Sequence, residues 1–399
     1  MYKIGEDAFM DGIMDTLEHA TKKLRGKRYQ SHKFCYDTAN NSIIEYDADQ
    51  EVSWKEYGET EHFTKPRDLT GFKQKLADRE SWFKYFLDGS RHAYKVDDMS
   101  FGKNVYPILA GQVGISCCRR DGKKMQQEFF RRKLVMSVPN SALPSEFDKI
   151  NDALRLREKI NKSDKLIMAR KKFKNENLSI DDIIPYNLDL DAKYESKGIA
   201  KIQDYMIEQE KNAVISLVRA NKVKAESYLI KDGSLEYKAV ENHNMNLSEA
   251  KMKHYYQYVI GVSKSFNPTK CYVKGGGTNS SIIAGLRINE RTPAYCYESK
   301  ISGEGVSFCV WYLRIRDSKY TQNVFDGIIK IEKLIQENEV KHGVDTDLID
   351  MLSAFLLKEA NPVCYGNDSR WANHLYPIYV AETYAKSKYM SNGLFLSLF

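Results

Sequence analysis

The sequence predicts an α/β protein in which a mixed sheet is flanked by helices. Three consecutive segments have strand character, namely Phe83 to Tyr94, Tyr106 to Cys118 and Phe129 to Val138. The last two are joined through Asp121-Gly122, a dipeptide typical of hairpin turns. The second observation is the segment from Ser196 to Lys222, where apolar residues recur at about 100° per residue, the period of a helix.

Composition indicates a folded protein and permits a polyanionic partner. The chain has 399 residues, of which 42% are hydrophobic and 12% aromatic, which is ample for a core. Its 61 basic and 54 acidic residues give a net charge of +7. Basic residues gather around the predicted hairpin: Arg119, Arg120, Lys123, Lys124, Arg131, Arg132 and Lys133. Solvated loop charge and a groove that tracks phosphates explain this cluster about equally well.

The cysteines and the apolar runs indicate the cellular environment. The seven cysteines include no Cys-x-x-Cys pair, so we expect reduced thiols in the core rather than a zinc site or disulfides. The N-terminal residues lack the apolar core of a signal peptide. No apolar run approaches the roughly 18 residues that a membrane span requires. We therefore expect a soluble, cytoplasmic protein with no membrane association.

The chain divides into a main domain with additions. We expect an N-terminal extension at residues 1–80, a domain at 81–392 with a helical insertion at 139–195, and an apolar C-terminal tail at 393–399. The extension, in which residues 5–25 have the pattern of an amphipathic helix, could mediate dimerisation, and the tail could dock on the core or bind a partner. Beyond the insertion we expect strands at 228–231, 257–263, 292–298 and 306–315, and helices at 323–339, 345–359 and 376–390. Glycines 275–277 precede a predicted helix, but no GxxxxGK[ST] motif is present, so the sequence shows no ATP-binding loop.

Three acidic residues stand out from this pattern. Asp88 and Asp232 each begin an Asp-Gly-Ser sequence, predicted as a turn that ends a buried strand. One such turn means little, but two could bring their carboxylates side by side on one sheet. Glu210 lies in the middle of the apolar arc of the helix at 196–222. A carboxylate there is costly unless it is paired or binds a metal, and a buried salt bridge is the structural alternative.

Taken together, these features resemble the NurA nuclease family. The matching segments are DGSR at Asp88, a helix with an embedded Glu, DGSL at Asp232, GVSKS at 261–265 and YPIYVAETYAKS at 376–387. Their order and spacing agree from about residue 80 to residue 392. The resemblance implies an RNase H-like fold, a homodimer, Mn²⁺- or Mg²⁺-dependent cleavage of DNA, and a hexameric HerA-type ATPase as the partner that feeds the DNA.

The resemblance also suggests roles for particular residues. Asp88, Glu210 and Asp232 fall where the family has its metal carboxylates. The family usually has a His after the YP-containing segment, whereas position 384 here is Tyr. Glu382 is the nearest alternative as the fourth catalytic ligand, and His374 is another. Arg91, Lys264 and Tyr376 are candidate DNA-binding residues.

The residue types suggest the chemistry. Three carboxylates can hold two Mg²⁺ or Mn²⁺ ions, of which one would activate a water and the other would stabilise the leaving 3′-oxygen. We therefore expect a DNA nuclease that acts with a HerA-type ATPase in DNA repair or in defence against invading DNA. The alternative is a non-catalytic subunit that binds DNA or recruits the ATPase, which Tyr384 favours. RNA cleavage would require a site that reads the 2′-hydroxyl.

Overall fold

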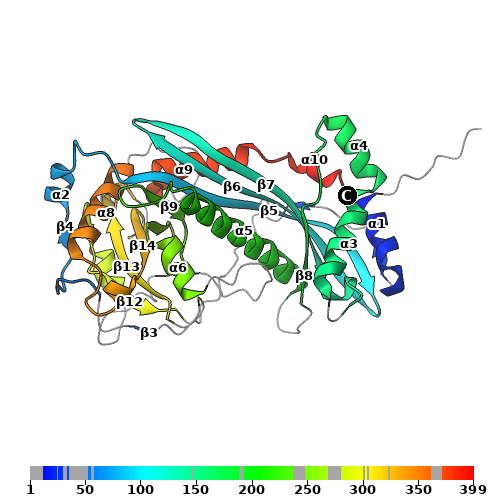
Figure 1. The fold of residues 1–399 in the computed structure, drawn as a ribbon, viewed down its shortest axis with the longest axis horizontal. Coiled ribbons are helices and arrows are strands. Elements are labelled where there is room, and N and C mark those ends of the chain that lie inside the picture. The colour runs from blue at the N-terminus through cyan, green and yellow to red at the C-terminus, as the bar shows by residue number, and fades with distance from the viewer. Residues whose placement is uncertain are drawn as a thin grey trace, which may run out of the picture.

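The computed structural model describes residues 12–24, 26–29, 34–35, 53–54, 58–145, 148–187, 193–236, 248–267, 280–299, 302, 305–321, 324–360 and 371–399. Within them, fourteen strands form one sheet in an elongated molecule (Figure 1). The main order is β3-β12-β13-β14-β10-β9-β5-β6-β7-β8, and β1, β2, β4 and β11 pair beside it. The pairs β5–β9, β9–β10 and β7–β8 are parallel and the other pairs are antiparallel, which confirms the predicted mixed sheet.

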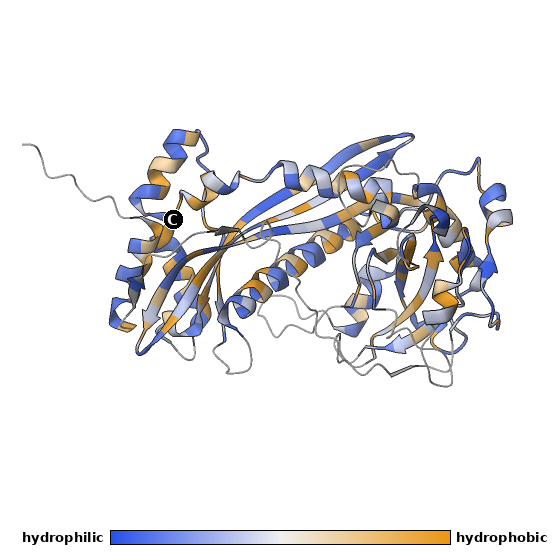
Figure 2. Ribbon diagram, turned by 180° about the vertical axis from the view of Figure 1, so that it is seen from behind, coloured by the Kyte–Doolittle hydropathy of each residue, from blue (hydrophilic) through white to orange (hydrophobic). Residues whose placement is uncertain are grey.

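Three long antiparallel strands extend along the molecule. They are β5 (Phe83–Phe101), β6 (Asn104–Asp121) and β7 (Lys124–Pro139), and they confirm the three predicted strands with longer bounds. Helix α5 (Tyr194–Arg219) covers one face of these strands, and α9 (Tyr376–Ser387) covers the other (Figure 1). Both helices were predicted, α5 from its apolar periodicity. The free end of the β6–β7 hairpin is largely hydrophilic (Figure 2).

The remaining sheet forms one end of the molecule. It contains β9 (Tyr228–Asp232), β10 (Val259–Ser263), β12 (Tyr295–Glu298), β13 (Ser307–Arg314) and β14 (Ile328–Leu334). Short strands β3 (Ser53–Trp54), β4 (Arg67–Asp68) and β11 (Glu290–Arg291) add to it. The helices of this end are α2 (Thr70–Lys75), α6 (Glu249–Tyr256), α7 (Ser280–Ala284) and α8 (Thr346–Glu359).

The prediction of a helix at 323–339 is wrong, because this segment contains the strand β14. The strand pairs with β13 on one side and β10 on the other. Its interior position buries Glu332 and Lys333, whose charges interrupt the alternation expected of a half-buried strand. Each has an ion partner, Lys330 for Glu332 and Glu339 for Lys333.

The other end of the molecule combines segments from both ends of the chain. It contains α1 (Ile13–Thr21), β1 (Lys27–Tyr29), β2 (Phe34–Cys35), α3 (Lys149–Asn161), α4 (Asp164–Phe173), β8 (Asp182–Tyr186) and α10 (Asn392–Leu396). The first two strands pair with β5, so parts of the expected N-terminal extension belong to the sheet. In the C-terminal segment, Phe395, Leu398 and Phe399 are buried in the core of this end. The tail therefore docks on the core.

The apolar side chains separate into clusters on the two faces of the central strands. Leu87 and Leu229 pack with α5, whereas Phe86 and Ile230 pack with α8 and α9. Because successive side chains of a strand point to opposite faces, these neighbours fix the direction of the residues that follow them. Five cysteines lie buried as free thiols; Cys271 and Cys364 are outside the described residues. None of the described helices has the length and apolar character to cross a membrane.

Candidate active site

Asp88 lies in the middle of β5, and its surroundings correct one prediction. The Asp-Gly-Ser sequence there is not a turn, since Asp88, Gly89 and Ser90 all pair with β6 as the strand continues to Phe101. Gly89 is needed for space: a Cβ atom would lie 2.4 Å from Oε1 of Glu210 on α5. Alternation then turns the buried Asp88 side chain toward the α9 face.

Asp232 lies beside Asp88, at the end of the neighbouring strand. The parallel register pairs Leu87 with Lys231, so the two acidic residues are neighbours across the strands. Here the predicted turn is confirmed, because Gly233 has a φ of +82° and ends β9. A positive φ is tolerated by glycine and disfavoured for residues with a Cβ. The two carboxylates that the sequence suggested are thus brought together on one face.

Lys264 and Glu382 complete the cluster on this face. Lys264 directly follows β10, and its Nζ lies 3.1 Å from Oδ2 of Asp232 and 2.8 Å from Oε2 of Glu382 on α9. Burial lowers the pKa of Lys264, but the Asp232 and Glu382 carboxylates outweigh this effect and raise it. Burial alone would raise the pKa of Glu382, yet Lys264 and Lys386 lower it to about 2. This face therefore holds a permanently charged bridge between two elements.

Glu210 forms a separate ion pair on the opposite face. Its Oε2 lies 3.0 Å from Nζ of Lys231, and each side chain is at most 5% exposed. Nζ of Lys231 also donates to the backbone carbonyl of Asp232 at 2.7 Å. The ammonium is held in its charged form, because the Glu210 carboxylate more than offsets the lowering of its pKa by burial. Glu210 is connected to the cluster on the α9 face only indirectly, through Lys231 and the adjacent Asp232. A buried salt bridge was the structural alternative to a metal-binding role that the sequence left open for Glu210.

Lys231, Glu332 and Asn373 support the cluster and were missed in the sequence. The buried Glu332 of β14 accepts hydrogen bonds at 2.7 Å from the hydroxyl of Ser234 and the backbone N–H of Leu235, which fixes the turn after Asp232. Asn373 donates to the backbone carbonyl of Lys264 at 2.5 Å. The signal for Lys231 was its place directly before Asp232 on a short buried strand. Asn373 gave no sequence signal.

The other predicted residues make contacts of their own. Arg91 donates to Oε1 of Gln203 on α5 at 2.6 Å, on the face opposite Asp88. Tyr376 is 41% exposed at the first turn of α9. His374 is buried and packs edge-on against Tyr379, with 5.6 Å between ring centroids. Tyr384 donates to Gln127 of β7 at 2.5 Å, so its hydroxyl is directed toward the hairpin.

Part of the basic cluster on the β6–β7 hairpin is used within the protein. Arg120 forms an ion pair with the buried Glu359 of α8. Lys133 pairs with Asp181 at 2.8 Å. Arg119 keeps 44% of its side chain exposed near the hydrophilic end of the hairpin. The hairpin therefore offers fewer cations to a polyanion than the sequence suggested.

The acidic side chains on the α9 face offer the oxygen ligands that a hard divalent cation prefers. Carboxylate oxygens are the ligands that Mg²⁺ and Mn²⁺ take in proteins. The Oδ2 atom of Asp88 is buried and accepts no hydrogen bond from the described residues. Burial raises the pKa of Asp88 well above its usual value, and Asp232 raises it further. As the described side chains stand, no three acidic, His or Cys residues surround one metal position, because ammonium groups lie between the carboxylates.

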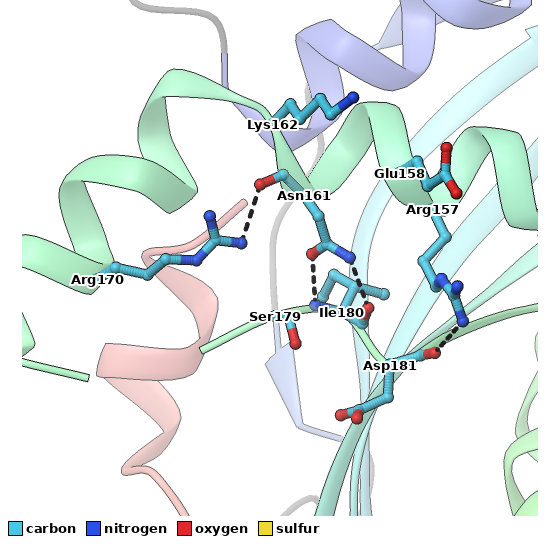
Figure 3. Close-up of a pocket in the computed structure, with 8 residues that line it drawn as sticks. All are labelled: Arg157, Glu158, Asn161, Lys162, Arg170, Ser179, Ile180 and Asp181. Atoms are coloured by element: carbon cyan, nitrogen blue, oxygen red, sulfur yellow. Dashed lines mark hydrogen bonds between the residues drawn. The ribbon is translucent and has the colours of Figure 1, made fainter. Parts of the chain in front are cut away.

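A cavity of about 460 Å³ lies far from this cluster, between α3, α4 and residues 179–181 (Figure 3). Its polar side chains mostly hold the backbone. Asn161 donates to the carbonyl of Ile180 and accepts from its N–H, both at 2.8 Å. Arg157 and Arg170 donate to backbone carbonyl groups at 2.7–3.1 Å. This arrangement explains the local fold without a ligand.

Comparisons with known proteins add little to this geometry. No protein-family model matches the sequence, and no curated protein sequence matches it. Among solved structures, the crystal structure of the NurA nuclease from Sulfolobus solfataricus aligns over 84% of this chain and 82% of its own, with a TM-score of 0.39 and 10% sequence identity. A likeness at this level assigns neither residues nor activity to the chain.

Proposed function

We propose that the chain is a metal-dependent nuclease that hydrolyses phosphodiester bonds in DNA. One observation carries the proposal: carboxylates from β5, β9 and α9 meet around Lys264, and a buried oxygen of Asp88 has no hydrogen-bond partner among the described residues. Buried carboxylates held together are costly unless a cation compensates them. Strongly perturbed acidic groups of this kind are typical of catalytic sites.

Asp88 and Asp232 are the residues we propose as direct metal ligands, with Glu382 beside them. A bound Mg²⁺ or Mn²⁺ supplies a Lewis acid for the phosphate and lowers the pKa of a bound water. The chain contributes rigidity, since Asp88 lies on a strand that is paired on both sides. Lys264 orients the carboxylates of Asp232 and Glu382 and adds positive charge where a phosphate would bind.

The test is DNA hydrolysis by the purified full chain in Mn²⁺. We expect Asp88→Asn and Asp232→Asn to abolish cleavage while circular dichroism and thermal melting show a folded protein. The matched control is Asp98→Asn on the same strand, which removes a carboxylate paired with Lys95 and lying ten positions from Asp88. Undiminished cleavage by the first two variants would exclude the assigned site. An RNA substrate in parallel decides which nucleic acid is cleaved.

The second candidate function is a non-catalytic subunit that binds DNA or recruits an ATPase. Tyr384 favours it, because it stands where the resembling family has a His and its hydroxyl is directed toward β7. This function predicts no Mn²⁺ binding that depends on the carboxylates of Asp88 and Asp232. Calorimetric titration of the two Asn variants separates the candidates.

We further propose a homodimer that acts with a hexameric HerA-type ATPase. The support is the motif resemblance and the absence from the sequence of a GxxxxGK[ST] loop, which leaves ATP hydrolysis to another protein. Co-purification with such an ATPase, and DNA degradation that requires its ATP hydrolysis, would support the assembly. Sedimentation as a monomer at micromolar concentration would contradict the dimer.

A further inference from the structure

Lys264 is an internal cation rather than a surface lysine. Only 7% of the residue is exposed, and its ammonium touches Asp232 of β9 and Glu382 of α9 at 3.1 and 2.8 Å. The residue is fixed at its other end as well, because Asn373 donates to its backbone carbonyl at 2.5 Å. A buried lysine anchored at both ends, between two carboxylates, occupies a position where a cation is required.

The acidic oxygens are not equally available to a further cation. Glu382 already has an ammonium on each oxygen, Lys264 on Oε2 and Lys386 on Oε1 at 2.7 Å. By contrast, Oδ2 of Asp88 is buried and accepts no hydrogen bond from the described residues. The open side of the cluster is therefore that of Asp88, next to Asp232.

We propose that this site takes a single divalent cation, at Asp88 and Asp232, and that the Lys264 ammonium stands in the place of a second. The inference rests on the proposed nuclease function and changes the two-ion site expected from the sequence. The positions of the ammonium groups support it: Lys264 lies between Asp232 and Glu382, Lys386 holds the other oxygen of Glu382, and Oδ2 of Asp88 accepts no hydrogen bond from the described residues. A second ion at Glu382 would have to displace one of these ammonium groups or lie directly beside it, which is costly in a buried site.

The test is a calorimetric titration of the full chain with Mn²⁺ alone, in the absence of DNA. We expect one Mn²⁺ per chain and an affinity lowered more than about tenfold in Asp88→Asn, as loss of a direct ligand should exceed the effect of outer-shell changes. Two ions per chain that depend on Asp88 would overturn this inference and leave the proposed nuclease standing. Absence of any binding that depends on Asp88 would overturn both.

A lysine variant tests the second position directly. Lys264→Met removes the bridging ammonium, and we expect a second Mn²⁺-binding event to appear and Mn²⁺ to raise its melting temperature more than that of the wild type. Lys386→Met is the matched control, because it removes the other ammonium on Glu382 from a side chain that is 51% exposed; one event is expected. A folded Lys264→Met protein with a single event would overturn the inference. If this variant does not fold, the wild-type stoichiometry still decides.

Discussion

The Lys231–Glu210 pair offers a quantitative test of how the two faces are built. The ion pair measures 3.0 Å and its side chains are only 5% and 3% exposed, so water cannot compensate either charge if the other is removed. Removing one partner of a buried pair typically costs about 3–5 kcal/mol. We expect Lys231→Met and Glu210→Met each to lower the free energy of unfolding by about that amount, because each leaves an isolated buried charge.

The double variant separates this explanation from a simple loss of packing. The double variant contains no unpaired buried charge, so we expect it to be no less stable than either single variant. The free-energy losses of the two single variants should exceed that of the double variant by a coupling energy of at least about 2 kcal/mol. Urea denaturation at pH 7 gives these energies from shifts of the midpoint at unchanged slope. Lys253→Met on α6 is the control, since its partner Glu249 is 43% exposed and the cost should stay below about 1 kcal/mol. Additive losses in the double variant would refute the reasoning.

Three further outcomes are expected. The pKa of Glu382 is lowered from 4.5 to about 2, so its carboxylate stabilises the fold above pH 4.5, and this contribution is lost as the pH falls through 2. At pH 6 the free energy of unfolding of the wild type should therefore exceed that of Glu382→Gln by about 3 kcal/mol. That difference should narrow as pH falls from 5 to 3 in urea titrations, and a constant difference would contradict it. Gln112→Leu removes the buried amide that bonds N–H and C=O of Met390 at 2.8 and 3.0 Å; we expect faster amide exchange in α10 and a loss of about 1–3 kcal/mol, whereas unchanged exchange would contradict the role. Arg291→Met removes the ion partner of the buried Glu59 and one of the two arginines that pair with the buried Asp350, the other being Arg67. Thermal melting should show a loss of about 3–5 kcal/mol, much larger than that of Arg287→Met, whose side chain is 85% exposed.

The sequence predicted the elements that carry long periodic patterns. The helix expected at 196–222 is α5, and the three strands expected at 83–138 are β5, β6 and β7, because many residues contribute to each pattern. The juxtaposition of Asp88 with Asp232 was also predicted. It followed from two similar motifs, although only the second of them is a turn.

The errors arise where tertiary contacts outweigh local pattern. The segment of β14 carries the charged residues Lys330, Glu332 and Lys333, which obscure the strand pattern. The burial of Glu332 and Lys333 is explained by their ion partners, Lys330 and Glu339, and by the hydrogen bond from Ser234 to Glu332. Gly89 lies within a continuous strand, and a glycine is present there because Glu210 of the distant helix α5 occupies the space that a Cβ atom would need. The local sequence contains no sign of this contact. The interleaving of lysines with carboxylates likewise depends on which strands are neighbours.

The peptide between Lys231 and Asp232 has a consequence for communication through the protein. Adjacent residues of a strand face opposite sides, so this one linkage joins the salt bridge under α5 to the acid cluster under α9. Any ligand that reorients Asp232 must act on a carbonyl that Lys231 holds at 2.7 Å. The strand β9 therefore joins the acid cluster on one face of the sheet directly to Glu210 of α5 on the other face.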